Sequence, residues 1–487
     1  MTLPALLSPE QNRTALRIVL GLFLVCCATQ ALAEQNLPES IAEALRRADI
    51  PVAAASFFVQ KVGAGGAREI GAPLVSVNAE SAMNPASTMK LVTTYVALEL
   101  LGPSFTWKTV AAAVGPVTGE VLHGDLFLKG SGDPKLVFED FWLLLRGIRA
   151  RGVREIRGDL VLDHSLFEAA VPDRGRFDGE PLKPYNVEPD ALLVNYKAVT
   201  LTFVPDPERL AVRVFAEPPL AGMRLGKLAA SLGACGDWKK RIGADFDDVK
   251  NIRFTGSYPI ACGEQSWSVS LLDHAQFVGA LFRRLWSEMG GTLRGEVRDG
   301  TLPPEAATIA VHESPSLAEI VRFINKYSNN VMARQLYLDL AAESLGVPAN
   351  PGLAAGVVRN FLGARGLSMP ELVIENGSGL SRVERISAHS MARLLLAAWD
   401  SPVMPEFVSS LSLVAADGTM KKRLAASGVS GRAHIKTGSL TGARAIAGYV
   451  LAASGARYVV VSFVNHGNAE AAREAQDALL QWVFERG

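Results

Sequence analysis

Residues 84–102 read NPASTMKLVTTYVALELLG, and this stretch decides the fold because it joins a reactive motif to a buried helix. Asn84 and Pro85 are residue types that begin helices, and the Gly102-Pro103 pair ends one. Apolar side chains between these signals cover almost the whole helix surface. A helix that is apolar on all sides is typical of the centre of a core, so we expect this one to be buried.

The first residues of this helix carry a candidate nucleophile. In Ser87-Thr88-Met89-Lys90, Ser and Lys are three positions apart, a spacing found at no other serine in the chain. Positions i and i+3 of a helix share a face, so the hydroxyl and the amine can meet. Burial would lower the lysine pKa and let the neutral amine act as a base toward the serine. Taken alone, the motif is also typical of a solvated surface pair.

A second motif, Ser328-Asn329-Asn330, interrupts a helical pattern that runs over residues 316–342. A hydroxyl and an amide that face a cleft can relay a proton and hold a peptide group of a substrate. An ordinary helix cap has the same composition. Ser76-Val77-Asn78 repeats the pattern, but it lies in a predicted strand and turn before Ser87, so we set it aside.

A third motif, Lys436-Thr437-Gly438 followed by Ser439, ends a predicted strand over residues 433–437. A strand edge beside a cleft presents backbone groups to a substrate, and a lysine with a hydroxyl would bind a terminal carboxylate there. Gly438 would let the substrate approach closely. The alternative is a simple turn into a hairpin, because strands at 443–451 and 457–464 and a helix at 469–484 are predicted to follow.

The three motifs occur in the order and the secondary-structure context of the penicillin-recognising serine enzymes. On these motifs the chain resembles the low-molecular-mass class C penicillin-binding proteins, the D-alanyl-D-alanine carboxypeptidase/endopeptidase family. Ser87 and Ser328 are 241 residues apart, whereas β-lactamases place the same motifs much closer. Other stretches that look like family signatures are residues 84–90, 130–134, 376–382, 417–419 and 436–440. One departure is Asn376, where the family often has aspartate.

The resemblance implies an α/β (α+β) fold, in which a penicillin-recognising serine transpeptidase/β-lactamase-like core carries two inserted, mostly β domains. Ser87 must meet Ser328 and Lys436 in one cleft, so the residues between about 105 and 300 must leave the core and return. The expected segments are a signal peptide at 1–33, the core at 34–104 and 302–487, inserted domain II at 105–185 and 267–301, and inserted domain III at 186–266.

The resemblance also implies roles for single residues. Ser87 would attack the carbonyl of the penultimate D-alanine, and neutral Lys90 would take its proton. Ser328 would pass a proton to the leaving amine, and Lys436 would keep that relay poised. The side chain of Asn330 would hold the substrate amide.

Substrate binding is implied for a second group of residues. The oxyanion would rest on the backbone N–H groups of Ser87 and Ser439, and Thr437 and Ser439 would bind the terminal carboxylate. In this family an aspartate of the first inserted domain helps recognise the amino-acid head of the third residue of the stem peptide. Asp163 looks like that position, and Arg382 would lie nearby. The alternative for Asp163 is a turn residue at the end of a strand.

Composition limits the classes of partner. Among 487 residues, Lys+Arg and Asp+Glu both number 49, so the formal net charge is zero and a general affinity for nucleic acid is not expected. The seven histidines are dispersed and no CxxC or HExxH motif occurs, so neither a metal nor a cofactor is expected. The expected partners are peptidoglycan stem peptides and cross-links, together with β-lactam antibiotics.

The first 33 residues predict export. Arg13 and Arg17 precede an apolar run over residues 18–28, and Ala31-Leu32-Ala33 gives the small-x-small pattern of a cleaved secretory signal peptide. An uncleaved N-terminal anchor is the alternative, although a spanning helix needs about 20 apolar residues. Cleavage would leave a periplasmic protein with at most a loose membrane association.

The cysteines agree with an exported protein. Cys26 and Cys27 lie within the predicted signal peptide and would leave with it. The remaining pair, Cys235 and Cys262, is then expected to form a disulfide in an oxidising compartment.

Other classes of protein fit the sequence less well. A β-lactamase shares the motifs, but it has no use for the long insertion, and no deacylating glutamate is identifiable. A non-catalytic peptidoglycan-binding protein would not need Ser87, Lys90 and Lys436 together. An α/β-hydrolase is disfavoured because no G-x-S-x-G occurs. The sequence therefore predicts a serine D-alanyl-D-alanine carboxypeptidase, an endopeptidase, or an enzyme with both activities.

Overall fold

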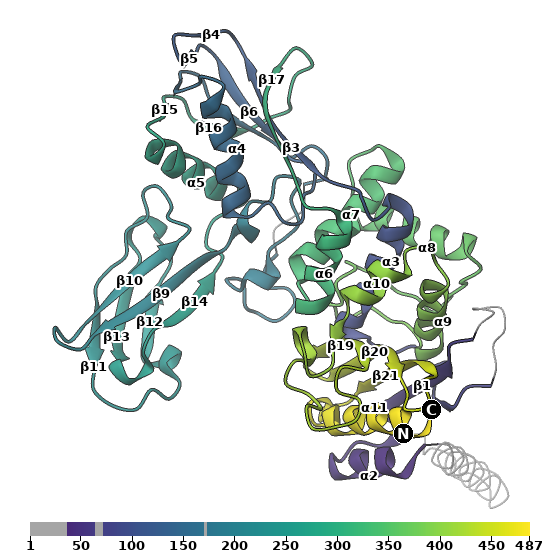
Figure 1. Ribbon diagram of the computed structural model, residues 1–487. Helices are drawn as coiled ribbons and strands as arrows, with labels where there is room; N and C mark the ends of the chain where they lie inside the picture. The colour runs from purple at the N-terminus through teal and green to yellow at the C-terminus, as the bar shows by residue number, and fades with distance from the viewer. Residues whose placement is uncertain (1–36, 64–71, 170–172) are drawn as a thin grey trace, which may run out of the picture.

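A computed structural model describes residues 37–63, 72–169 and 173–487. The predicted signal peptide, residues 1–33, lies outside these ranges. Within them, none of the helices has both the length and the apolar character needed to cross a membrane. The fold is a mixture of helices and sheets in which a central sheet joins both ends of the chain (Figure 1).

The central sheet has six strands in the order β18-β19-β20-β21-β1-β2, and each neighbouring pair is antiparallel. Its strands are β1 (Ala55–Lys61), β2 (Val75–Val77), β18 (Ser412–Leu413), β19 (Ala433–Leu440), β20 (Ala443–Leu451) and β21 (Arg457–Asn465). Strand β1 pairs with β21, so the purple start and the yellow end of the chain lie side by side in Figure 1. The predicted core built from both chain ends is confirmed.

Alternation along the strands gives the sheet two buried faces. In β20, Ala445, Ala447 and Tyr449 belong to the large helical core, whereas Ile446 and Val450 pack on the opposite face. That opposite face is covered by α2 (Glu39–Arg47) and α11 (Arg473–Arg486). The helices of the large core are α3 (Lys90–Leu101), α6 (Leu317–Tyr327), α7 (Asn330–Leu345), α8 (Pro351–Ala364), α9 (Ala388–Trp399) and α10 (Met404–Ser410).

Helix α3 is buried over Lys90–Leu98, as its apolar surface predicts. The prediction that this helix begins at Asn84 is wrong, because a 3-10 turn over Ala86–Met89 precedes it. The Asn84 side chain accepts a hydrogen bond from the backbone N–H of Ala86, two residues on. Such a local bond offers the backbone an alternative to the α-helix, so the regular helix starts only at Lys90.

The segment that leaves the core forms two further sheets beside α4 (Phe138–Ala150) and α5 (His274–Glu288). One has five strands in the order β16-β8-β6-β3-β17 and the other has four in the order β15-β7-β5-β4. The five strands are β3 (Lys108–Val114), β6 (Asp125–Lys129), β8 (Leu160–Asp163), β16 (Val297–Asp299) and β17 (Ala307–Glu313). The four are β4 (Val117–Thr118), β5 (Val121–Leu122), β7 (Glu155–Ile156) and β15 (Thr292–Leu293). Strand β17 lies beyond residue 301, the predicted end of domain II, yet it pairs with β3 of the segment that leaves the core.

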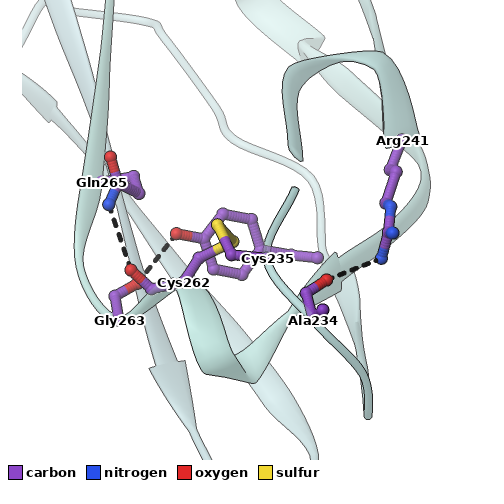
Figure 2. The surroundings of a disulfide bond; sticks show 7 residues. Ala234, Cys235, Arg241, Cys262, Gly263 and Gln265 are labelled. Carbon is purple, nitrogen blue, oxygen red and sulfur yellow. Dashed lines mark hydrogen bonds between the residues drawn. A yellow bond between two sulfur atoms is a disulfide. The ribbon is translucent and has the colours of Figure 1, made fainter. Parts of the chain in front are cut away.

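A separate six-stranded sheet, in the order β12-β13-β11-β10-β9-β14, occupies the region assigned to domain III. Its strands are β9 (Val199–Asp206), β10 (Ala211–Glu217), β11 (Leu228–Ser231), β12 (Ile242–Asp245), β13 (Arg253–Pro259) and β14 (Gln265–Val269). The expected disulfide between Cys235 and Cys262 is present and links two loops of this sheet (Figure 2). Gln265 adds a hydrogen bond from its side chain to the Cys262 carbonyl, at 3.0 Å.

Candidate active site

The candidate nucleophile lies on a tightly held turn. Ser87 belongs to the 3-10 turn Ala86–Met89, and the preceding Ala86 has a φ of +45°, a conformation that few non-glycine residues adopt. The side-chain amide of Asn84 donates to the Ser381 carbonyl at 2.9 Å, and the Asn465 side chain accepts from the Asn84 N–H at 2.8 Å. These bonds fix the nucleophile's turn to segments nearly 300 and 400 residues away.

Lys90 is fully buried beneath Ser87. Its Nζ lies 3.1 Å from Ser87 Oγ, 2.6 Å from Asn330 Oδ1 and 2.5 Å from the Ser378 carbonyl. Burial, reinforced by the positive charge of Lys436, holds the Lys90 pKa well below its usual value. A lysine whose charged form is disfavoured in this way can accept the proton of a neighbouring hydroxyl.

Ser328 and Lys436 form a second hydroxyl–amine pair. Ser328 follows α6 in the left-handed conformation, with a φ of 58°, and so separates α6 from α7. Lys436 Nζ lies 2.9 Å from Ser328 Oγ and 2.6 Å from the Thr437 carbonyl. Burial lowers the pKa of Lys436 to about 7. Lys90 contacts Ser87 and Asn330, and Lys436 contacts Ser328. The charge of Lys436 also lowers the pKa of Lys90, which links the two groups of contacts. The structure thus brings the five predicted residues together.

Strand β19 approaches the nucleophile's turn at Gly438. A Cβ at this position would lie 2.8 Å from the Pro85 carbonyl oxygen and 2.9 Å from the Ser87 N, closer than real Cβ contacts. The sequence predicts that Gly438 lets a substrate approach closely; in the structure a glycine is also required for the close approach of the strand itself. The missing side chain lets β19 pack directly against the backbone that carries Ser87.

The last residues of β19 direct polar groups toward this site. Leu440 pairs with Ala443 across a two-residue turn, so Ser439 and Arg444 form the next pair, in which backbone N–H groups point away from the partner strand. The Ser439 hydroxyl accepts a hydrogen bond from Arg444 Nη1 at 2.7 Å. Thr437 Oγ1 donates to Thr419 Oγ1 at 2.8 Å. The Ser439 N–H therefore points away from β20.

Sequence reasoning missed the groups that hold the Ser378 carbonyl against Lys90. Glu384 is fully buried, and one of its carboxylate oxygens accepts from the N–H groups of residues 375, 376 and 377. Asn376 Oδ1 accepts from both the N–H and the hydroxyl of Ser378, at 2.9 and 2.7 Å. Burial raises the pKa of Glu384, while the three N–H donors and Lys90 oppose the rise. The signature at 376–382 signalled this loop, although residue types alone do not show that a backbone carbonyl contacts the lysine.

Asp163 and Arg382 lie in different settings. Asp163 is fully buried at the end of β8, and its two carboxylate oxygens accept from the N–H groups of Ser165 and Leu302, at 2.9 and 2.8 Å. Arg382 packs over the Phe177 ring, 4.5 Å from its centroid, and donates to the Thr441 carbonyl. It lines a cavity of about 430 Å³ together with residues such as Asp173, Phe177 and Arg334. None of the contacts of Asp163 reaches this cavity among the described residues.

No group of His, Cys, Asp or Glu within residues 37–63, 72–169 and 173–487 is arranged to hold a metal ion. The described site presents hydroxyl, amine, amide and backbone carbonyl groups in contact with one another. Two buried amines, each beside a serine hydroxyl, are suited to moving protons to and from those hydroxyls.

Comparison with known proteins identifies similar chains over nearly the whole length. The family model of the D-Ala-D-Ala carboxypeptidase 3 (S13) family matches residues 37–485. The D-alanyl-D-alanine carboxypeptidase of Actinomadura sp. (strain R39) is 31% identical over 430 residues, which cover 84% of this chain and 78% of that protein.

Solved structures show the same fold. The crystal structure of penicillin-binding protein 4 from Haemophilus influenzae superposes with a TM-score of 0.75 and 20% identity, over 94% of this chain and 99% of that one. The structure of the same protein complexed with a β-lactam gives a TM-score of 0.72 and 20% identity, over 91% of this chain and 100% of that one. The predicted α+β fold with a penicillin-recognising core is confirmed.

Proposed function

Since this chain belongs to the D-Ala-D-Ala carboxypeptidase 3 (S13) family and is thus a serine hydrolase, we propose that Ser87 is its nucleophile and Lys90 the base. The observation that carries the proposal is the 3.1 Å contact between Lys90 Nζ and Ser87 Oγ, made by a fully buried lysine whose pKa is lowered. Both features are what activation of a serine hydroxyl requires.

Acylation begins when Ser87 Oγ attacks the carbonyl of the penultimate D-alanine and its proton passes to Lys90. The oxyanion of the tetrahedral intermediate accepts from the backbone N–H groups of Ser87 and Ser439. The direction of the Ser439 N–H, away from β20, supports this role. One such donor typically lowers the barrier by about 2.7–4 kcal/mol.

Departure of the leaving amine needs a proton, which we assign to the Ser328–Lys436 pair. Their 2.9 Å contact lets Lys436 supply a proton to the hydroxyl as the hydroxyl gives its own to the amine. A Lys436 pKa of about 7 suits this exchange at neutral pH. Water then attacks the acyl-enzyme and releases the product.

Substrate positioning falls to the amide of Asn330 and to Thr437 and Ser439. The Asn330 Oδ1 is bound to Lys90, which leaves its NH₂ group to donate to a substrate carbonyl. The hydroxyls of Thr437 and Ser439 line one cavity beside β19 and are assigned to the terminal carboxylate of the substrate.

We assign the cavity beside Arg382 to the side chain of the stem peptide's third residue. The sequence predicts Asp163 as the acidic partner in this subsite; each of its two oxygens accepts one backbone N–H group and keeps a further lone pair for a ligand. Three further acidic residues, Asp173, Glu188 and Glu375, line the cavity together with Arg382. An acidic and a basic side chain together suit an amino-acid head group.

The substrate class that follows is D-alanyl-D-alanine-type bonds in peptidoglycan, cleaved as a carboxypeptidase, an endopeptidase or both. The enzyme would act in the periplasm after removal of residues 1–33, with at most a loose membrane association. A β-lactam would acylate Ser87 and leave slowly. The β-lactam complex of the Haemophilus influenzae protein with the same fold supports this assignment.

The test is acylation by a fluorescent penicillin, with intact-mass detection, on residues 34–487 and on the Ser87→Ala variant. We expect one adduct per chain, mapped to Ser87, absent from the variant and long-lived. An adduct that turns over quickly would instead favour a β-lactamase. No adduct on folded protein would refute the enzymatic role and favour a non-catalytic peptidoglycan-binding protein.

A further inference from the structure

A cavity of about 350 Å³ lies beside the Thr437–Ser439 end of β19. Side chains from the loop before β19, from β20 and from α11 line it, and none of the described lining residues is acidic. We call it the basic cavity because five of its lining residues are Lys421, Lys422, Arg423, Arg444 and Arg473.

The positive charge of the basic cavity is largely uncompensated. Asp477 pairs with Arg423 at 2.5 Å and lies 3.9 Å from Arg473. Lys421, Lys422 and Arg444 form no ion pair with any carboxylate in the part of the chain that the structure describes. Burial lowers the pKa of Arg423, and the charges of Arg473 and Arg444 lower it further, against the opposing effect of Asp477. One carboxylate, that of Asp477, thus pairs with two of the five cationic groups, and the other three have no acidic partner among the described residues.

A buried amide supplies an independent sign of a ligand. Gln476 lines the basic cavity and is fully buried, yet neither its Nε2 nor its Oε1 has a hydrogen-bond partner. Buried polar groups are nearly always paired with protein, ordered water or a ligand. An unpaired amide next to a surplus of cations is suited to a ligand that carries both carboxylates and peptide groups.

The location of the basic cavity identifies which part of a substrate reaches it. Thr437 and Ser439 line the cavity, and we have assigned their hydroxyls to the carboxylate next to the leaving amine. In the carboxypeptidase reaction the leaving group is free D-alanine, which has one carboxylate. In the endopeptidase reaction the leaving amine belongs to the acceptor stem peptide of a cross-link, which continues into further peptide and carries additional carboxylates.

We propose that the basic cavity binds an additional carboxylate of the acceptor stem peptide, so that the enzyme selects cross-links over substrates that release free D-alanine. The inference rests on the proposed function and names its preferred substrate. Lys421 and Lys422 are exposed and supply attraction that salt would screen, since exposed charges interact weakly beyond about 8 Å at physiological ionic strength.

The test compares kcat/KM for a cross-linked muropeptide dimer and for a monomeric pentapeptide, using the Lys421→Gln/Lys422→Gln double variant. We expect about a tenfold loss on the dimer, the size that two solvated charge pairs supply, with little change on the pentapeptide. A dimer whose acceptor carboxylates are amidated should lose the wild-type advantage. The matched control is Lys239→Gln/Lys240→Gln, an adjacent lysine pair in the distant 3-10 turn Trp238–Arg241, which should leave both rates unchanged.

Penicillin acylation, measured on the same samples, separates this inference from the proposed function. Equal losses on the two substrates, or no loss on the dimer, with normal acylation at Ser87 would overturn the basic cavity as the selecting site. A wild-type protein that penicillin does not acylate would instead overturn the proposed function. A dimer effect that persists after amidation of the acceptor would also contradict the charge-based inference.

Discussion

Replacement of Gly438 by alanine tests the packing of β19 against the nucleophile. The added Cβ would lie 2.8 Å from the Pro85 oxygen, 2.9 Å from the Ser87 N and 3.0 Å from the Ala86 Cβ, none of which is the flexible end of a side chain. Restoring an ordinary contact of 3.4 Å from Ser87 N requires a shift of 0.5 Å, the difference between 3.4 and 2.9. Such overpacking costs about 1–3 kcal/mol of stability.

The kinetic effect should exceed the loss of stability. A strand that moves away from Ser87 takes the Ser439 N–H out of the oxyanion position, and loss of one such donor lowers the rate by about 10²- to 10³-fold. The assay is the second-order rate of penicillin acylation, with thermal unfolding measured in parallel. Folded Gly438→Ala that acylates within threefold of the wild-type rate would refute the reasoning. Gly467→Ala is the matched control, because a Cβ there meets nothing within 4 Å.

Two further predictions concern pH and the disulfide. Acylation should fall as the pH rises through about 7, because Lys436 must be protonated to supply the proton that Ser328 passes to the leaving amine, and the pKa of Lys436 lies near that value; a stopped-flow profile that is flat from pH 5.5 to 8.5 would contradict this. The same lowered pKa means that the unfolded chain binds more protons than the folded one between pH 7 and about 10.5, so the stability should rise with pH in that range. Replacing both Cys235 and Cys262 by alanine should lower the stability by about 3.5 kcal/mol, the loop-closure value for a separation of 27 residues, and leave penicillin acylation unchanged; a matching loss of acylation would show that the link supports the active site.

The sequence predicted the elements whose signal lies in residue type and spacing. The apolar helix after Ser87 and the strands at 443–451 and 457–464 were predicted correctly, because alternation and helical periodicity report burial directly. The strand predicted at 433–437 continues to residue 440. The start of α3 was misplaced, because a hydrogen bond from Ala86 N to Asn84 competes with the helix and leaves no mark in the periodicity.

Long-range contacts of the site were harder to predict. The Ser378 carbonyl that contacts Lys90 belongs to the backbone, so this contact cannot be predicted from the residue type. Glu384 carries no signal in the sequence, since glutamate is usually exposed, whereas here three backbone N–H donors bind its buried carboxylate. The assignment of Asp163 stays a prediction; its position at a strand end was evident, but its contacts with Ser165 and Leu302 depend on how β8 meets the chain returning after β16.

The pairing of β1 with β21 has a consequence for the order in which the enzyme is made. Strand β1 emerges early in synthesis, but the strand that lies against it is among the last to be completed. The contacts of Ser87 and Lys90 with Lys436 and β19 can therefore form only after almost the entire chain has been synthesised. On the proposed roles, a prematurely terminated chain would have a nucleophile without its oxyanion site, and we expect such incomplete copies to be inactive.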